Sequence, residues 1–210
     1  MSPQPKPKAP RTPPEQLVRD PVDSVEFSGT LWRIHRTAGQ YVLAWNQLRT
    51  YGPLPSMRWD PHPGAAPGPR TEGVLYAAAD VATSLAEVYQ TTRVIDTRAG
   101  APTLTAWQPQ RPVRLLDLSG TWLLRNSASA ALLAAPRSTC RRWARAIHTT
   151  WPDLDGLYVP STMTGRPNIV LWNAAVDSIP EMPGFSRPLA QPLVWSIAQA
   201  AATEIGYTVL

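Results

Sequence analysis

The sequence predicts an α+β fold, or a mixed-sheet α/β fold, for a chain of 210 residues. Two observations support this class. Short apolar runs typical of strands alternate irregularly with amphipathic, alanine-rich stretches typical of helices, so the regular repeat of a doubly wound parallel sheet is missing. In addition, the chain contains neither GxGxxG nor GxxxxGK[ST], so it lacks the common dinucleotide-binding fingerprint and the P-loop.

The length fits one domain with a sizeable core and is too short for two comfortable ones. The opening MSPQPKPKAPRTPPEQ combines proline, lysine and polar residues, and such a composition cannot bury much apolar area. We therefore expect a disordered tail over residues 1–22 and a single domain over residues 23–210.

The first predicted strand, GTLWRIHR, begins at Gly29. In a strand, alternate residues share a face, so Arg33 lies on the same face as Leu31 and His35. The charged Arg33 side chain is therefore expected on a specific face of a largely apolar strand. A short helix over 39–48 and a loop over 51–55 are expected to follow.

The next strand, GVLYAAA, begins at Gly73, and Asp80 suits the N-cap of the helix after it. A 3.6-residue spacing predicts an apolar stripe of Val81, Leu85 and Val88, which leaves Glu87 on the flank of that helix, at the rim of the core. The remaining predicted elements are strands at 103–107, 113–118, 157–161 and 168–172, and helices at 122–135, 138–149 and 192–205.

The net charge of +5 comes almost wholly from arginine, because lysine occurs only at Lys6 and Lys8. The arginines are scattered apart from one cluster, Arg141, Arg142 and Arg145, so an anionic partner is permitted but not required.

A single cysteine excludes an internal disulfide, and three histidines without ligand spacing give no reason to expect a metal site. No signal-like segment and no run of about 20 apolar residues is present, so we expect a cytoplasmic protein.

Five polar residues occupy places where a fold does not need them: Arg33, Arg58, Tyr76, Glu87 and Ser161. Each has a purely structural explanation when taken alone. The arginine stems can cover a sheet edge or stack on Trp59, the tyrosine can belong to the core, the glutamate can face solvent, and the serine can end a strand.

Four stretches that contain these residues, LWRIHR, MRWDP, GVLYAAADVATSLAEVY and DGLYVPSTMTGRPNIVLWN, resemble in order and local pattern the RES domain family, which is named after arginine, glutamate and serine. The resemblance runs from Gly29 to Asn173. The chain departs from the family in three places. Trp32 stands before the first arginine, where the family often has tyrosine or phenylalanine. The usual glycine-arginine-tryptophan-asparagine reads Met-Arg-Trp-Asp, ending at Asp60, and residues 62–72 look like an insertion. Asp60 adds a negative charge near the expected site.

The resemblance implies a fold similar to ADP-ribosyltransferases, with a largely antiparallel split β-sheet and flanking helices. It implies NAD as the substrate, no metal, and the role of a toxin in a bacterial toxin–antitoxin pair. Glu87, Arg33 and Ser161 take the catalytic positions by this comparison. The implied NAD-binding residues are Arg33, Arg58, Tyr76 and Ser161. The implied partner is an antitoxin with an Xre-like region, through which nucleic acid is met only indirectly, and self-association is also expected.

The residue types suit this chemistry. Cleaving the bond between nicotinamide and ribose develops positive charge on the sugar, which the Glu87 carboxylate can face. Guanidinium groups at Arg33 and Arg58 offer planar forks of donors to a pyrophosphate, Tyr76 offers a flat face to nicotinamide, and Ser161 a hydroxyl to a ribose or phosphate oxygen.

Three acceptors for the ADP-ribose group remain open: water, phosphate, and a protein side chain, the last of which would make the protein a mono-ADP-ribosyltransferase. An alternative of another class is a non-catalytic nucleic-acid-binding module that uses the arginines of the helix at 138–149.

Overall fold

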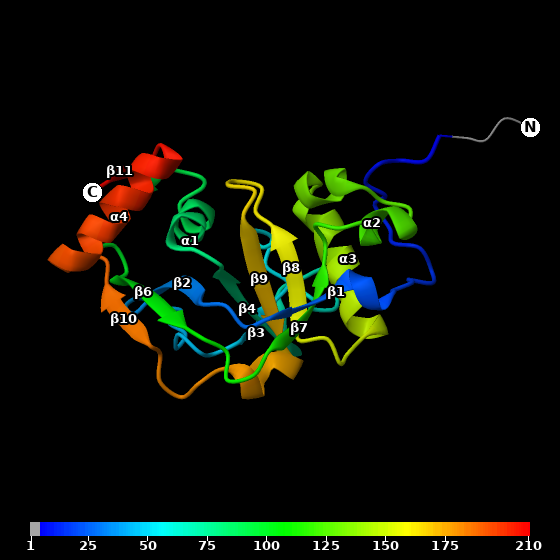
Figure 1. Cartoon of the computed structure of the whole chain (residues 1–210), viewed down its shortest axis with the longest axis horizontal. Helices are drawn as coiled ribbons and strands as arrows, with labels where there is room; N and C mark the ends of the chain where they lie inside the picture. Colours follow the sequence, from blue (N-terminus) through cyan, green and yellow to red (C-terminus); the bar gives the residue numbers. More distant parts are fainter. Residues whose placement is uncertain (1–4) are drawn as a thin grey trace, which may run out of the picture.

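The computed structural model describes residues 5–210, and its α+β fold is built around one curled, mixed sheet (Figure 1). In spatial order the strands are β1 (Ser24–Phe27), β7 (Val113–Asp117), β8 (Gly156–Pro160), β9 (Pro167–Trp172), β4 (Gly68–Ala78), β2 (Leu31–Arg36), β6 (Pro102–Trp107) and β10 (Phe185–Pro188). Every neighbouring pair is antiparallel except β7 and β8. The expected mixed, largely antiparallel sheet is therefore confirmed.

The sheet divides along one edge of β4. The first part of this edge pairs with β3 (Arg49–Gly52), with Arg49 opposite Val74. Its last part pairs with β2 only through Trp32 and Ala78, whereas β2 pairs with β6 over its full length. Residues 75–77 of β4 thus lie where β2 and β3 diverge, and we call this place the split.

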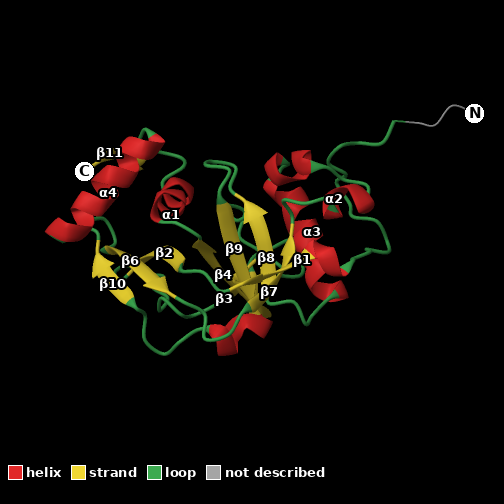
Figure 2. Cartoon of the chain, in the orientation of Figure 1, coloured by secondary structure: helices red, strands yellow, loops and turns green. Residues whose placement is uncertain are grey.

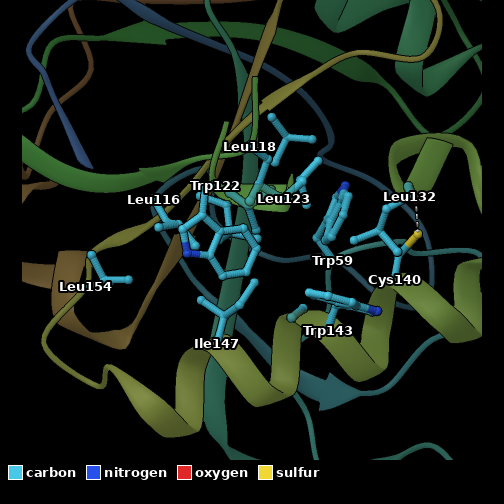
Figure 3. Close-up of a cluster of buried hydrophobic side chains, with 14 of the residues drawn as sticks. Trp59, Leu116, Leu118, Trp122, Leu123, Leu132, Cys140, Trp143, Ile147 and Leu154 are labelled. Carbon is cyan, nitrogen blue, oxygen red and sulfur yellow. Dashed lines mark hydrogen bonds between the residues drawn. The ribbon is translucent and has the colours of Figure 1, made fainter. Parts of the chain in front are cut away.

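Helices cover the outer face of the sheet in two groups, one on each side of β8 and β9 in Figure 2. The first group comprises α2 (Trp122–Arg125), the 3₁₀ helix Ala130–Ala134 and α3 (Arg137–Thr150). Their apolar side chains, with Trp122 and Trp143 edge to face, form the cluster in Figure 3. Burial of these large side chains fixes α3 against the half of the sheet that contains β9 and β4.

The second group comprises α1 (Val81–Val88) and α4 (Pro192–Ile205), which pack over β2 and β6 around Leu85 and Leu104. A third cluster, which includes Leu31, Leu75 and Trp107, fills the inside of the curl. A 3₁₀ helix at Asn173–Ser178 follows β9, and β5 (Val94–Ile95) and β11 (Thr208–Val209) form a small parallel sheet. None of the helices within residues 5–210 is long and apolar enough to cross a membrane.

The strong sequence patterns are confirmed. Helix α4 has the expected bounds, because Pro192 begins it and Gly206, with φ of +70°, ends it. The Asp80 side chain caps α1 by accepting a hydrogen bond from the Thr83 amide at 2.8 Å. The strands at 103–107, 113–118, 157–161 and 168–172 are all present, with one or both ends of each shifted by a residue.

Three expectations for local structure are wrong. Residues 39–48 form no helix, because this segment turns at Gly39 (φ +123°) and sends Trp45 into the inner cluster. The expected loop at 51–55 begins inside β3. The expected helix at 122–135 breaks into α2 and a 3₁₀ turn, since Ser127 adopts a φ of +61°.

Two further differences concern β4 and α1. Strand β4 begins at Gly68, so it takes in part of the insertion at 62–72. Val88 does not join the apolar stripe of α1, because its side chain is 51% exposed.

The N-terminal segment also differs from the expected disordered tail, although residues 1–4 lie outside the described residues. Leu17 is buried in the cluster under α3. The indole of Trp143 donates to the Pro10 carbonyl, and that of Trp122 to the Val18 carbonyl, both at 2.9 Å. Proline lacks an N–H but keeps its carbonyl, so this extended segment supplies acceptors to two buried indoles.

Candidate active site

Glu87 and Ser161, which the sequence analysis singled out separately, are in direct contact. The Ser161 hydroxyl donates to Oε1 of Glu87 at 2.6 Å, and Asn168 Nδ2 donates to the same oxygen at 2.8 Å. The second carboxylate oxygen, Oε2, receives only a long 3.4 Å contact from Gln90. Two donors on one oxygen orient the carboxylate and leave the other oxygen available to a ligand.

Local structure explains why these residues meet. Glu87 lies in the last turn of α1, which packs against β2 and the end of β4. Ser161 begins the tight turn between β8 and β9, where Gly165 has a φ of +75°. Its hydroxyl accepts a 3.0 Å hydrogen bond from the Met163 amide, which leaves the hydroxyl proton for Glu87. Asn168 stands at the start of β9.

Arg33 lies in the middle of β2, next to the split. Its Nη1 donates to the Trp45 carbonyl at 2.7 Å. Burial, followed by the charge of nearby Arg49, lowers the pKa of Arg33 to about 10, so the group is still a cation at neutral pH. Among residues 5–210, no carboxylate forms an ion pair with it.

Tyr76 lies at the split itself. Its hydroxyl donates to Oδ1 of Asp60 at 2.8 Å and accepts from the Trp59 amide at 3.1 Å. Burial, strengthened by the charge of Asp60, raises the pKa of Tyr76 well above its usual value. The phenol is therefore neutral at neutral pH, and its ring is held at a fixed angle.

The two groups of residues occupy the same face of neighbouring strands. Tyr76 is opposite Val170 and Ala78 is opposite Asn168, so Tyr76 and Asn168 are diagonal neighbours on one face of the β4–β9 pair. Such neighbours have Cα atoms about 7 Å apart. Asn168 binds Glu87, and Tyr76 lies beside the split that Arg33 flanks. Glu87, Ser161 and Tyr76 are thus gathered on the outer face at one end of β4. The strand register places Trp32 on this face, so the Arg33 side chain starts from the inner face, beside the split.

Arg58 is placed differently. Its Nη1 donates to the Ala135 carbonyl and lies 3.5 Å from the Cys140 sulfur, so this side chain reaches toward the start of α3. No hydrogen bond within residues 5–210 links it to Arg33 or Glu87.

The arginine cluster on α3 is occupied by backbone carbonyls. Arg141 binds those of Leu54, Pro55 and Met57, Arg142 that of Arg11, and Arg145 those of His62 and Gly64. These contacts attach residues 54–64 and the N-terminal segment to α3. They give the cluster a structural role and supply no observation that favours a nucleic-acid site.

Sequence reasoning missed two participants, Arg49 and Asn168. Asn168 begins a strand and shows no local signal of function. Arg49 Nη2 donates to Asp60 Oδ1 at 2.6 Å. The separation of these two residues in the sequence matches neither the helical nor the strand repeat, so the sequence pattern did not predict their contact.

Among the described residues, no group of three or more His, Cys, Asp or Glu side chains is arranged to hold a metal ion.

The curled and split sheet, the helices on its outer face and the side chains at the split define an α+β protein with an ADP-ribosyltransferase-like fold. The RES domain family model matches residues 30–195, and the chain belongs to this family.

A solved chain of the M. tuberculosis MbcT–MbcA toxin–antitoxin complex is similar in fold. The TM-score is 0.57 at 16% identity, over 84% of this chain and 92% of that chain. No curated protein matches the sequence.

Proposed function

We propose that this protein is an NAD-cleaving enzyme that breaks the bond between nicotinamide and ribose and passes ADP-ribose to water or phosphate. The observation that carries the proposal is the Glu87 carboxylate, oriented by Ser161 and Asn168 on the face of the β4–β9 pair that also holds Tyr76.

Glu87 has the chemistry that the reaction needs. As the C1′–N bond breaks, its electron pair leaves with nicotinamide and positive charge spreads over the ribose ring. A fixed carboxylate stabilises that charge without reorganising, which lowers the barrier to bond cleavage. Since Ser161 and Asn168 occupy Oε1, Oε2 is the oxygen proposed to face the sugar or to hold one of its hydroxyls.

Arg33 supplies the anion site in this proposal. A partly buried cation without a carboxylate partner loses some of its hydration, and an anionic ligand offsets that loss. The pyrophosphate of NAD matches a guanidinium because two oxygens accept two parallel N–H bonds. Anchoring the phosphates at Arg33 also fixes the distance from the nicotinamide ribose to Glu87.

Tyr76, Ser161 and Arg58 complete the proposed site. The Tyr76 ring is proposed to stack on nicotinamide, and Ser161 to act through Glu87 and on a ribose or phosphate oxygen. Arg58 has one guanidinium nitrogen committed to Ala135, so its proposed contact with NAD uses the remaining donors.

The biological role proposed is that of a toxin in a toxin–antitoxin pair, with an Xre-like antitoxin as partner. Membership of the RES domain family and the likeness in fold to a chain of a toxin–antitoxin complex support this role. Mono-ADP-ribosylation of a protein remains the competing reaction, since it needs the same first step and differs only in the acceptor.

Product analysis tests the proposal. The purified protein is incubated with NAD, with and without phosphate, and the products are identified by mass. Free ADP-ribose identifies hydrolysis, ADP-ribose with an added phosphate identifies phosphorolysis, and modified protein identifies transfer. Intact NAD under all conditions would overturn the proposed activity.

A further inference from the structure

One buried carboxylate, that of Asp60, joins β3 and β4 at the split. Asp60 is fully buried and accepts hydrogen bonds from Arg49 Nη2 at 2.6 Å, Tyr76 Oη at 2.8 Å and the Leu54 amide at 2.8 Å. Arg49 belongs to β3 and Tyr76 to β4. The carboxylate therefore fixes one side chain from each strand.

Arg49 and Arg33 lie on β3 and β2, the two strands that diverge along one edge of β4, and the charge of Arg49 contributes to the lowered pKa of Arg33. Two neighbouring cations repel each other, and a nearby negative charge offsets part of this repulsion. Asp60 offsets the charge of Arg49, and Arg33 is left unpaired. The pair of guanidinium groups plus one buried carboxylate carries a net positive charge at the split.

We propose that Asp60 is a positioning residue for the NAD site, holding Arg49 at the split and setting the angle of the Tyr76 ring. This inference rests on the proposed function and adds Arg49 as a second guanidinium group for the pyrophosphate. Arg49 makes no other contact with a carboxylate among residues 5–210, and its Nε has no hydrogen-bond partner there, so a donor remains for a ligand.

The same geometry explains how the site tolerates an acidic residue where the family motif has asparagine. Oδ1 faces Arg49 and Tyr76, and Oδ2 faces the Leu54 amide. The negative charge of Asp60 is thus neutralised by Arg49 and by hydrogen-bond donors of the protein itself. Asparagine has only one acceptor oxygen and its NH₂ group would meet a donor, so it cannot satisfy all three partners of Asp60.

The test is the Asp60→Asn protein, with binding of ADP-ribose measured by calorimetry and turnover of NAD measured in parallel. ADP-ribose carries the pyrophosphate and is not consumed. We expect its Kd to rise about tenfold or more, the loss typical of hydrogen bonds to charged groups. The KM for NAD is expected to rise by a similar factor, and kcat to fall less.

Asp155→Asn is the matched control. Asp155 is also a buried carboxylate that binds an arginine, Arg111, and a backbone amide, that of Arg114. It lies at the start of β8, separated from β4 by β9. We expect this variant to lose thermal stability while its Kd for ADP-ribose stays at the wild-type value.

Arg49→Lys keeps the inference testable if Asp60→Asn does not fold. A lysine retains the charge opposite Asp60 but loses the planar fork, so weaker ADP-ribose binding is again expected.

The outcomes separate the inference from the proposed function. Wild-type affinity in both Asp60→Asn and Arg49→Lys would overturn the positioning role and leave the proposed function intact, and equal losses in Asp60→Asn and Asp155→Asn would also overturn it. A wild-type protein that neither binds ADP-ribose nor consumes NAD would overturn the proposed function, and the inference with it.

Discussion

The hydroxyl of Ser161 donates a 2.6 Å hydrogen bond to Oε1 of Glu87, although 74 positions of sequence separate the two residues. Ser161 directly follows β8, in the half of the sheet covered by α3, and Glu87 belongs to a helix packed over β2. This contact therefore ties the turn after β8 to the C-terminal end of α1.

Removing the Ser161 hydroxyl tests its positioning of Glu87. Ser161→Ala is expected to lower kcat about 10- to 100-fold, because the carboxylate loses one of its two strong donors and its fixed orientation. The KM for NAD is expected to change less. Unchanged kcat in steady-state NAD consumption, with Asn168 intact, would show that Ser161 serves only the turn.

Arg33 and Arg58 are distinguished by their surroundings. Arg33→Gln is expected to raise the KM for NAD about tenfold or more, since it removes an unpaired, partly buried cation from the proposed anion site. Arg58→Gln is expected to raise KM by a smaller factor and to lower the melting temperature, because this guanidinium anchors residue 58 to Ala135. A larger KM effect at Arg58 than at Arg33 would reverse the proposed order.

The carboxyl of Asp60 predicts a specific acid sensitivity. Burial acts to raise its pKa, but nearby His62, the charge of Arg49 and the hydrogen bonds from Leu54 and Arg49 outweigh burial and lower it from 3.8 to about 2. His62 Nδ1 is 3.5 Å away and Arg49 only 2.6 Å, so we take Arg49 to be the firmer cause.

The Asp60 carboxyl has a higher pKa in the unfolded chain than in the folded chain, so the unfolded chain binds the proton more tightly. The stabilisation is therefore complete above pH 3.8 and is lost as the pH falls to about 2, by about 2 kcal/mol in total. The Asp60→Asn protein is expected not to show this loss of stability between pH 3.8 and about 2. If the wild type and the variant lost stability equally between these two pH values, the assignment would be wrong.

The N-terminal segment makes a prediction about stability. Deleting residues 1–12 removes the Pro10 carbonyl that accepts from Trp143 and the Arg11 carbonyl that accepts from Arg142. A buried indole N–H left without an acceptor costs about 1–3 kcal/mol, so a lower denaturant midpoint is expected. A free tail would give no change. Trp143→Phe in the full-length chain removes the same indole bond together with part of the buried ring, so it is expected to cost more than the deletion of that acceptor alone.

Elements with local signals were predictable from the sequence. Helix α4 has proline at its start and glycine at its end, and β2 and β4 have apolar patterns long enough to define them. Strands β1 and β3 have four residues each and no such pattern. They exist because β7 and β4 offer edges to pair with, which is a property of the assembled sheet.

The candidate site divides in the same way. The family resemblance drew attention to Glu87, Ser161 and Tyr76 because the motifs retain the residue types. The roles of Arg49 and Asn168 depend on contacts between strands, which no spacing in the sequence expresses. Asp60 stands where the family motif has asparagine, and its sequence neighbours do not show which residue balances its charge. The structure pairs it with Arg49.

Turnover of NAD by Glu87→Gln tests the central claim most directly. Glutamine keeps the size of the side chain and an oxygen that can accept from Ser161 and Asn168, while the negative charge is lost. The wild type is expected to consume NAD, and the folded variant, checked by its melting temperature, to lose that activity by about 100-fold or more, the scale of a removed electrostatic stabiliser. Consumption of NAD by Glu87→Gln at the wild-type rate would contradict the account.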